Sequence, residues 1–288
     1  MQSRPRPDAG NPCGLDQRST PGLVFHEGVI FFGYNGGLPD LKSTVTEGWR
    51  PLVARSAILV GLAVLLAGFL AVVGSTIVGR HGGGVLQNWD ESVGHWFLHH
   101  RTGLVGIAKA IAFLGDAPIL GAIATVITLI LLALGQRARA LVPLAAYLGG
   151  ELLVYMTRVY VHRPRPITAN YPAPGSIPGI HETSFSFPSG HATAGSAVVI
   201  SLAGLAAITW KVWWPWIVGG LLVGTVAGSR LVLGVHWFSD VTFGMVVGVI
   251  WGVAAVYVLA DPPWPWRSHL TTGLQAEPPA KSASACPE

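Results

Sequence analysis

The chain contains few charged residues for its length. Only 11% of its 288 residues are Asp, Glu, Lys or Arg, whereas 51% are hydrophobic. A soluble domain carries about 25% charged residues, so the composition excludes an ordinary soluble protein and predicts a polytopic membrane protein. The net charge of +4 is scattered, with no polybasic stripe, which argues against a nucleic-acid partner.

Cysteine and metal-binding patterns are also scarce. The only two cysteines, Cys13 and Cys286, lie in the two tails, which indicates neither a disulfide framework nor a thiolate metal site. No short apolar segment with a small-residue cleavage site directly follows a basic start, so we expect no cleavable signal peptide. No carboxylates are spaced as metal ligands, and we expect no cofactor.

What the chain does contain is a series of long apolar segments. A helix needs roughly 20 residues to cross about 30 Å of hydrocarbon, and six segments approach or reach this length. Residues 89–113 mix aromatic and charged side chains, as is typical of a helix lying at the membrane interface. We therefore predict an all-α bundle of about six transmembrane helices plus one interfacial helix. The predicted spans are 57–78, 117–134 with Asp116 as its N-cap, 140–156, 189–209, 212–228 and 241–260.

Three regions follow from this pattern. Residues 52–260 form the predicted transmembrane domain, preceded by a mostly irregular tail over 1–51 and followed by a disordered tail over 261–288. Six spans place both termini on one side, and the distribution of Arg and Lys assigns that side to the cytoplasm. The loop 158–188 and the segment around His236 are then expected at the outer face of the cytoplasmic membrane.

One short segment between two apolar runs concentrates ionisable side chains, namely Arg230, His236 and Asp240. Each charge carried to the membrane centre costs roughly 2.5–3.5 kcal/mol, so these residues are predicted to be functional. His236 and Asp240 are four residues apart and would share one face of a helix. The carboxylate could then hold one imidazole nitrogen and leave the other nucleophilic, while Arg230 binds an anion. We interpret the segment as half of a phosphate-transfer site.

The segment 187–191 supplies a second part at the start of the fourth span. Ser189 is a suitable N-cap, and Gly190 lets a ligand approach the backbone. Free N–H groups at a helix start bind anions, and a protonated His191 beside that anion could donate to a leaving oxygen.

The third part is a pair of arginines at the end of the third span. Arg158 and Arg165, with six residues between them, can hold phosphate oxygens in bidentate pairs. Arg163 is interpreted as a loop or headgroup contact and not as part of the site, and Glu182 in the same loop could touch a headgroup. Glu151 is expected to hydrogen-bond between helices or to support Arg158.

Together the three segments resemble the signature of the type 2 phosphatidic acid phosphatase superfamily of integral membrane lipid phosphatases. That signature is Lys-x6-Arg-Pro, then Pro-Ser-Gly-His, then Ser-Arg-x5-His-x3-Asp. The second and third parts match at every fixed position, whereas Arg158 stands where the family usually has Lys. The resemblance covers residues 57–260.

The resemblance implies a role for each matching residue. His236 resembles the nucleophile that becomes phosphorylated, and Asp240 resembles its orienting partner. His191 resembles the acid that protonates the leaving group and then helps water to attack, without any metal. The phosphate cradle implied by the resemblance is Arg158, Arg165, Ser189, Gly190 and Arg230.

We therefore expect metal-independent hydrolysis of a lipid phosphate or pyrophosphate through a phosphohistidine. Polyprenyl pyrophosphate, phosphatidic acid and phosphatidylglycerophosphate are the candidate substrates, and membrane lipid is the other expected partner. A lipid phosphotransferase of the same family, a non-catalytic anion- or lipid-binding membrane protein and a transporter remain alternatives. The ionisable groups gather at span ends on one side, which disfavours a transporter. Neither the headgroup nor the oligomeric state follows from the sequence.

Overall fold

The computed structural model describes residues 22–26, 29–33, 41–79, 83–166, 176–180 and 182–260, with side chains from Ala54 onward. The chain divides into two compact units, residues 1–53 and 54–288. In the first unit, β1 (Gly22–His26) and β2 (Val29–Gly33) form an antiparallel hairpin. These parts of the tail predicted as mostly irregular thus have regular structure. The rest of that tail and the tail from residue 261 lie outside the described residues.

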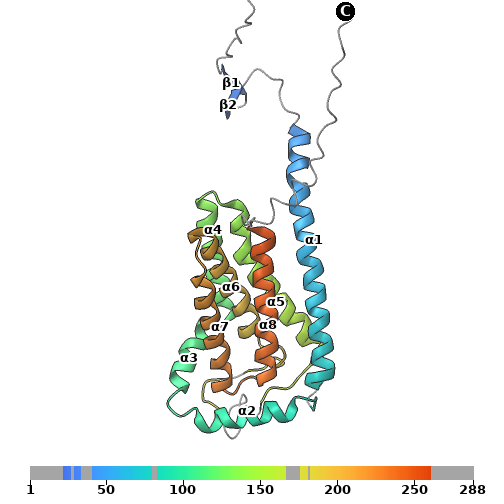
Figure 1. The fold of residues 1–288 in the computed structure, drawn as a ribbon, viewed down its shortest axis with the longest axis vertical. Helices are drawn as coiled ribbons and strands as arrows, with labels where there is room; N and C mark the ends of the chain where they lie inside the picture. Colours follow the sequence, from blue (N-terminus) through green and yellow to red (C-terminus); the bar gives the residue numbers. More distant parts are fainter. Residues whose placement is uncertain are drawn as a thin grey trace, which may run out of the picture. The chain divides into compact units, whose positions relative to one another are not determined.

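The second unit confirms the predicted all-α membrane bundle (Figure 1). Among the described residues, five helical segments are long and apolar enough to cross a membrane, and a sixth span results if the bent pair α3 and α4 is counted as one. The two helices of that pair meet at 44°. The first span, Ala54–Gly79, consists of the part of α1 (Leu41–Val73) from Ala54 onward and the π-helical turn η1 (Gly74–Gly79). The other spans are α3 (Val105–Leu114) with α4 (Ala117–Ala133), α5 (Arg137–Val161), α6 (Gly190–Trp210), α7 (Trp214–Val232) and α8 (Phe238–Leu259).

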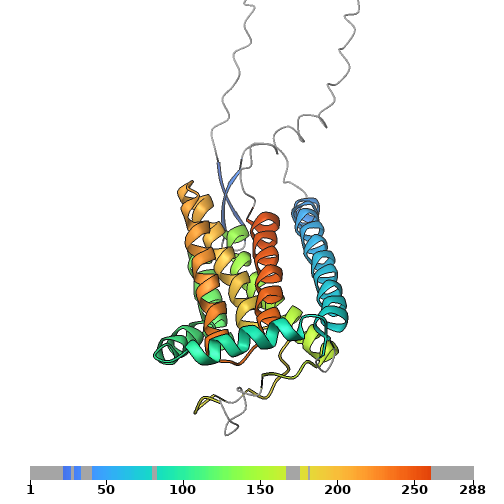
Figure 2. The same ribbon diagram turned by 60° about the horizontal axis from the view of Figure 1, so that its bottom comes forward.

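The predicted single interfacial helix over residues 89–113 is wrong. The chain forms two helices there, α2 (Gln87–His100) and α3, with a turn between them. Gly103 in this turn has φ of +83°, a conformation that glycine adopts without the steric cost paid by other residues. Only α2 crosses the end of the bundle, as the teal helix in Figures 1 and 2 shows, and α3 belongs to the bent span.

Helix α6 forms the centre of the bundle. In its most apolar 18-residue stretch 72% is buried, whereas in the other single-helix spans the share is 50% or less. It packs against α8 through glycines spaced four residues apart. A Cβ on Gly248 would lie 2.2 Å from the Thr193 carbonyl oxygen, and one on Gly252 would lie 2.6 Å from that of Ala197. Small residues allow such close helix contact in membranes.

These contacts advance in the same direction along both helices, which shows that α6 and α8 run parallel. The start of α6 therefore lies beside the start of α8, where the Ser189 N–H donates to the Asp240 carbonyl oxygen at 3.1 Å. Both starts carry residues that the sequence predicts to be functional.

Substituting Gly248→Ala is expected to destabilise the protein by about 1–3 kcal/mol, because the added methyl group forces α6 and α8 apart. The matched control is Gly220→Ala on α7, where a Cβ would meet nothing within 4 Å. Thermal unfolding in detergent, followed by size-exclusion chromatography, measures the difference. Equal unfolding temperatures for the two variants would contradict the close contact.

Candidate active site

The predicted histidine and arginine side chains converge on one cavity at the end of the bundle where α6 and α8 begin. Its volume is about 480 Å³. Two predicted site residues, Ser189 and Asp240, are fully buried and do not line it. The six predicted residues that do line it are Arg158, Arg165, Gly190, His191, Arg230 and His236.

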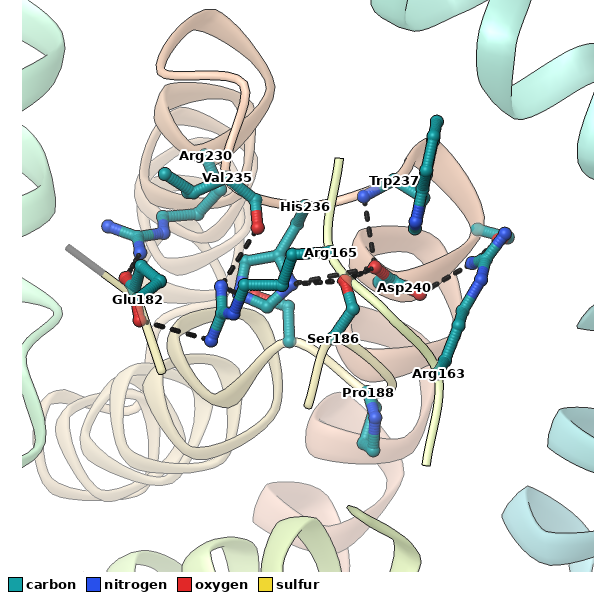
Figure 3. A network of polar contacts seen from close by, with 12 residues as sticks. Arg163, Arg165, Glu182, Ser186, Pro188, Arg230, Val235, His236, Trp237 and Asp240 are labelled. Atoms are coloured by element: carbon teal, nitrogen blue, oxygen red, sulfur yellow. Dashed lines mark hydrogen bonds and ion pairs between the residues drawn. The ribbon is translucent and has the colours of Figure 1, made fainter. Parts of the chain in front are cut away.

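His236 lies in the loop before α8, which begins at Phe238. The expectation that His236 and Asp240 share a helix face is therefore wrong, although the two side chains still meet. His236 Nδ1 is 3.5 Å from Asp240 Oδ2, and Nε2 is 3.0 Å from Arg165 Nη1 (Figure 3). One nitrogen thus faces the carboxylate, and the other faces a guanidinium that lines the cavity.

The surroundings of His236 favour its neutral form. Burial, together with the guanidinium groups of Arg165, Arg230 and Arg158, lowers the pKa of His236 well below its usual value. Burial also lowers the pKa of Arg165 to about 10, so this arginine remains a cation at neutral pH. A neutral imidazole that accepts from Arg165 at Nε2 has a lone pair on the nitrogen that faces the cavity.

Asp240 is held by several donors. Its Oδ2 accepts from the Trp237 backbone N–H at 2.9 Å and from the Ser186 hydroxyl. Its Oδ1 accepts from Arg163 Nη1 at 2.6 Å (Figure 3). These bonds fix the carboxylate that faces His236.

Arg163 is fully buried, so its interpretation as a headgroup contact is wrong. Besides Asp240, it binds Asp90 of α2, with Nη2 2.7 Å from Oδ2. Asp90 also accepts from the Ser239 backbone N–H at 2.7 Å. A buried arginine therefore joins the interfacial helix to the start of α8.

The sequence offered only a weak signal for these two residues. Arg163 stands two positions before Arg165, but an arginine next to a proline in a polar loop is equally typical of an exposed position. Asp90 lies in a helix rich in charged and aromatic residues, where nothing marks it as buried.

His191 has a carboxylate of its own. Its Nε2 is 2.9 Å from Asp116 Oδ1. Asp116 occupies the predicted N-cap position of α4, but its side chain makes no capping hydrogen bond. The bend between α3 and α4 brings both Asp116 and Gly115 to His191, because a Cβ on Gly115 would lie 2.9 Å from His191 Cδ2.

Among the predicted site residues, two have a buried donor without a hydrogen-bond partner within the part of the chain that the structure describes. These donors are the Ser189 hydroxyl and Arg230 Nε. Buried polar groups are nearly always paired, so Arg230 Nε, in a side chain that lines the cavity, is suited to a polar ligand. Across the same described ranges, no group of three His, Cys, Asp or Glu side chains is arranged to hold a metal, and the expectation of metal-independent chemistry stays a prediction.

The family model of the PAP2 superfamily matches residues 139–264, which contain α5 to α8 and all three sequence motifs. The part of the chain that carries the three motifs therefore matches the PAP2 superfamily. The resemblance noted from the motifs is thereby confirmed.

Similar proteins carry phosphatase names. The chain is 28% identical over 159 residues to a decaprenylphosphoryl-5-phosphoribose phosphatase of Mycobacterium tuberculosis, an alignment that covers 54% of this chain and 80% of that protein. It is 35% identical over 66 residues to an undecaprenyl-diphosphatase of Sulfolobus acidocaldarius, covering 23% of this chain and 30% of that protein.

A solved structure shares the PAP2 fold. The crystal structure of a transmembrane PAP2-type phosphatidylglycerolphosphate phosphatase from Bacillus subtilis aligns with a TM-score of 0.53 and 22% identity. The alignment covers 72% of this chain and 94% of that chain.

Arg158, the one departure from the PAP2 signature, still projects toward the cavity. Its Nε donates to the Pro188 carbonyl oxygen at 3.3 Å, and its Nη2 lies 3.6 Å from the place of a Cβ on Gly190. The positive charge expected from lysine is therefore present beside the start of α6.

Substituting Arg163→Leu is expected to destabilise the helical bundle strongly, because the carboxylates of Asp90 and Asp240 lose their shared cation. Breaking a buried ion pair costs about 3–5 kcal/mol. The matched control is Arg137→Leu, which removes an exposed arginine at the start of α5. Thermal unfolding of both variants in detergent tests this, and similar small shifts would argue against a stabilising role for Arg163.

Substituting Gly115→Ala is expected to displace the His191 ring, since the new methyl group would also lie 2.8 Å from Val226 Cγ1. A displacement of about 1 Å at a reacting group lowers a rate by roughly a hundredfold. Phosphate release is compared with that of Gly106→Ala, where a Cβ on α3 would meet nothing within 4 Å. If both variants kept the wild-type rate, the position of His191 would not matter for the reaction.

Proposed function

We propose that the protein is a metal-independent phosphatase of lipid phosphates or lipid pyrophosphates that forms a phosphohistidine at His236. The observation that carries this proposal is the position of His236 Nε2, 3.0 Å from Arg165 in a cavity that also contains Arg158, Arg230 and His191. The match to the PAP2 superfamily and the phosphatase names of its relatives support a phosphatase.

In the first step, the lone pair on His236 Nε2 attacks the phosphorus atom while the bond to the leaving oxygen breaks. Protonated His191 donates its proton to that oxygen. The guanidinium groups of Arg158, Arg165 and Arg230 hold the non-bridging oxygens and stabilise their growing charge. The backbone at Gly190, which lines the cavity, supplies a further donor at the start of α6.

In the second step, water attacks the phosphorus atom of the phosphohistidine, and the bond to Nε2 breaks. Neutral His191 accepts the proton from water, and inorganic phosphate leaves. Asp240, fixed by Arg163 and the Trp237 N–H, stabilises the positive charge of the phosphorylated imidazole through Nδ1–H.

The substrate that we favour is a polyprenyl-linked phosphate or pyrophosphate, because two relatives are named for decaprenyl and undecaprenyl compounds. The cavity has apolar walls at Phe113, Pro118 and Ile119 beside its polar groups, which suits a lipid attached to a charged headgroup. Phosphatidic acid and phosphatidylglycerophosphate belong in the same test panel. The excess of Arg and Lys on the side of the termini supports a site at the outer face of the cytoplasmic membrane.

Substituting His236→Ala is expected to lower phosphate release by about a thousandfold or more, because the nucleophile is lost. The measurement is inorganic phosphate released in detergent, with a chelator and no added metal, from each lipid of the panel. His100→Ala, at an exposed position on α2, is the matched control. Wild-type turnover in His236→Ala would refute the proposed nucleophile.

The intermediate is tested with substrate labelled at the reacting phosphorus. In the wild-type protein, rapid quenching during a single turnover is expected to trap an acid-labile and alkali-stable phosphoprotein, which His236→Ala does not form. Addition of a lipid alcohol separates hydrolysis from transfer, because a phosphotransferase would form a new phosphate ester from it. Absence of any labelled protein in single-turnover quenching would contradict the phosphohistidine.

A further inference from the structure

A carboxylate of the protein binds two of the arginines assigned to the phosphate cradle. Glu182, in the loop before α6, places Oε1 2.6 Å from Arg230 Nη2 and Oε2 3.1 Å from Arg165 Nη2 (Figure 3). Its side chain lines the cavity and is 24% exposed, whereas those of Arg165 and Arg230 are 4% and 6% exposed. The two oxygens of Glu182 thus bridge the two guanidinium groups as two oxygens of a phosphoryl group would.

The hydrogen-bond donors of Arg165 are fully committed. A guanidinium has five N–H groups, and Arg165 makes five polar contacts with the residues that the structure describes. Nε donates to the Ser184 carbonyl oxygen, Nη1 to the Val235 carbonyl oxygen and to His236 Nε2, and Nη2 donates to the Ser184 hydroxyl and forms an ion pair with Glu182. A phosphoryl oxygen can therefore bind Arg165 only by replacing one of these acceptors.

Glu182 is the acceptor most easily replaced. Two of the others are backbone carbonyl oxygens. His236 Nε2 gives up its contact when it attacks phosphorus, but this frees only Nη1, which still donates to the Val235 carbonyl oxygen. The Glu182 contact is the longest of the five, at 3.1 Å, and comes from a partly exposed side chain. Replacement would also release Arg230 Nη2, which donates to Glu182 Oε1 at 2.6 Å.

We propose that Glu182 competes with the phosphoryl group for Arg165 and Arg230, and that it thereby determines how weakly the site retains inorganic phosphate. The proposal rests on the phosphatase function proposed above. Every phosphate that enters must displace the same carboxylate, so substrate and product both bear the free-energy cost of breaking the ion pairs of Glu182. A lipid phosphate also contacts the apolar wall at Phe113 and Ile119, whereas inorganic phosphate has only the arginines. The product is therefore released while the lipid substrate still binds.

The test is Glu182→Gln, which removes the charge and keeps the size of the side chain. Competition predicts that inorganic phosphate binds about tenfold more tightly and that KM for the lipid falls, because phosphate no longer displaces a charged partner. If Glu182 only positions the arginines, the changes in phosphate affinity and in KM are expected to have the opposite sign. Without the carboxylate, Arg165 and Arg230 repel each other, and both phosphate binding and KM become worse. A weaker or unchanged affinity for inorganic phosphate would overturn the proposal.

Binding of inorganic phosphate is measured by calorimetry on the full chain in detergent, so the result does not depend on turnover. Glu182→Asp, whose side chain is one methylene shorter, keeps the charge but bridges the arginines less well. It should give an affinity between those of wild type and Glu182→Gln. Glu91→Gln, at an exposed position on α2, is the matched control and should bind phosphate as wild type does. A wild-type protein that binds phosphate but hydrolyses no lipid would refute the proposed function alone.

Discussion

The buried guanidinium of Arg163 is the contact on which the candidate site depends. A buried charge requires partners, and Arg163 has a carboxylate on each side, Asp90 from α2 and Asp240 from α8. Asp90 in turn accepts from the backbone N–H and the hydroxyl of Ser239. This arrangement ties the interfacial helix and the first turn of α8 to the loop after α5. It fixes the carboxylate that faces His236, so the orientation of the proposed nucleophile follows from a contact outside the cavity.

Parallel packing of α6 and α8 supplies the second constraint. Glycines on α8 let the two helices approach until their starts adjoin. Helix starts carry partial positive charge and free N–H groups, so two such ends beside three arginines create a strongly anion-attracting region. At the edge of a membrane, this positive region must be compensated by carboxylates. Because the two helix starts lie side by side, the carboxylates must lie beside them.

The sequence predicted most of the spans because hydrophobic length is a local property. It also identified six of the residues that line the cavity, among them His191, Arg230 and His236, which interrupt apolar runs where charge is costly. It failed where the deciding contact is distant in the chain. Nothing near Asp90 indicates that it meets Arg163, and the four-residue spacing of His236 and Asp240 suggested a helix that in fact begins after His236.

Carboxylates accompany the cationic and imidazole groups of the site in a regular way. Asp240 faces His236, Asp116 faces His191, and Glu182 bridges Arg165 and Arg230. Buried guanidinium groups left without partners would cost several kcal/mol each, so the fold itself requires such carboxylates. A phosphate then enters by exchange with an existing negative charge and not by binding to bare cations. Exchange limits the net affinity for phosphate, because the binding free energy of phosphate is offset by that of the carboxylate it displaces. Weaker binding of inorganic phosphate speeds its release, which favours turnover in the proposed phosphatase.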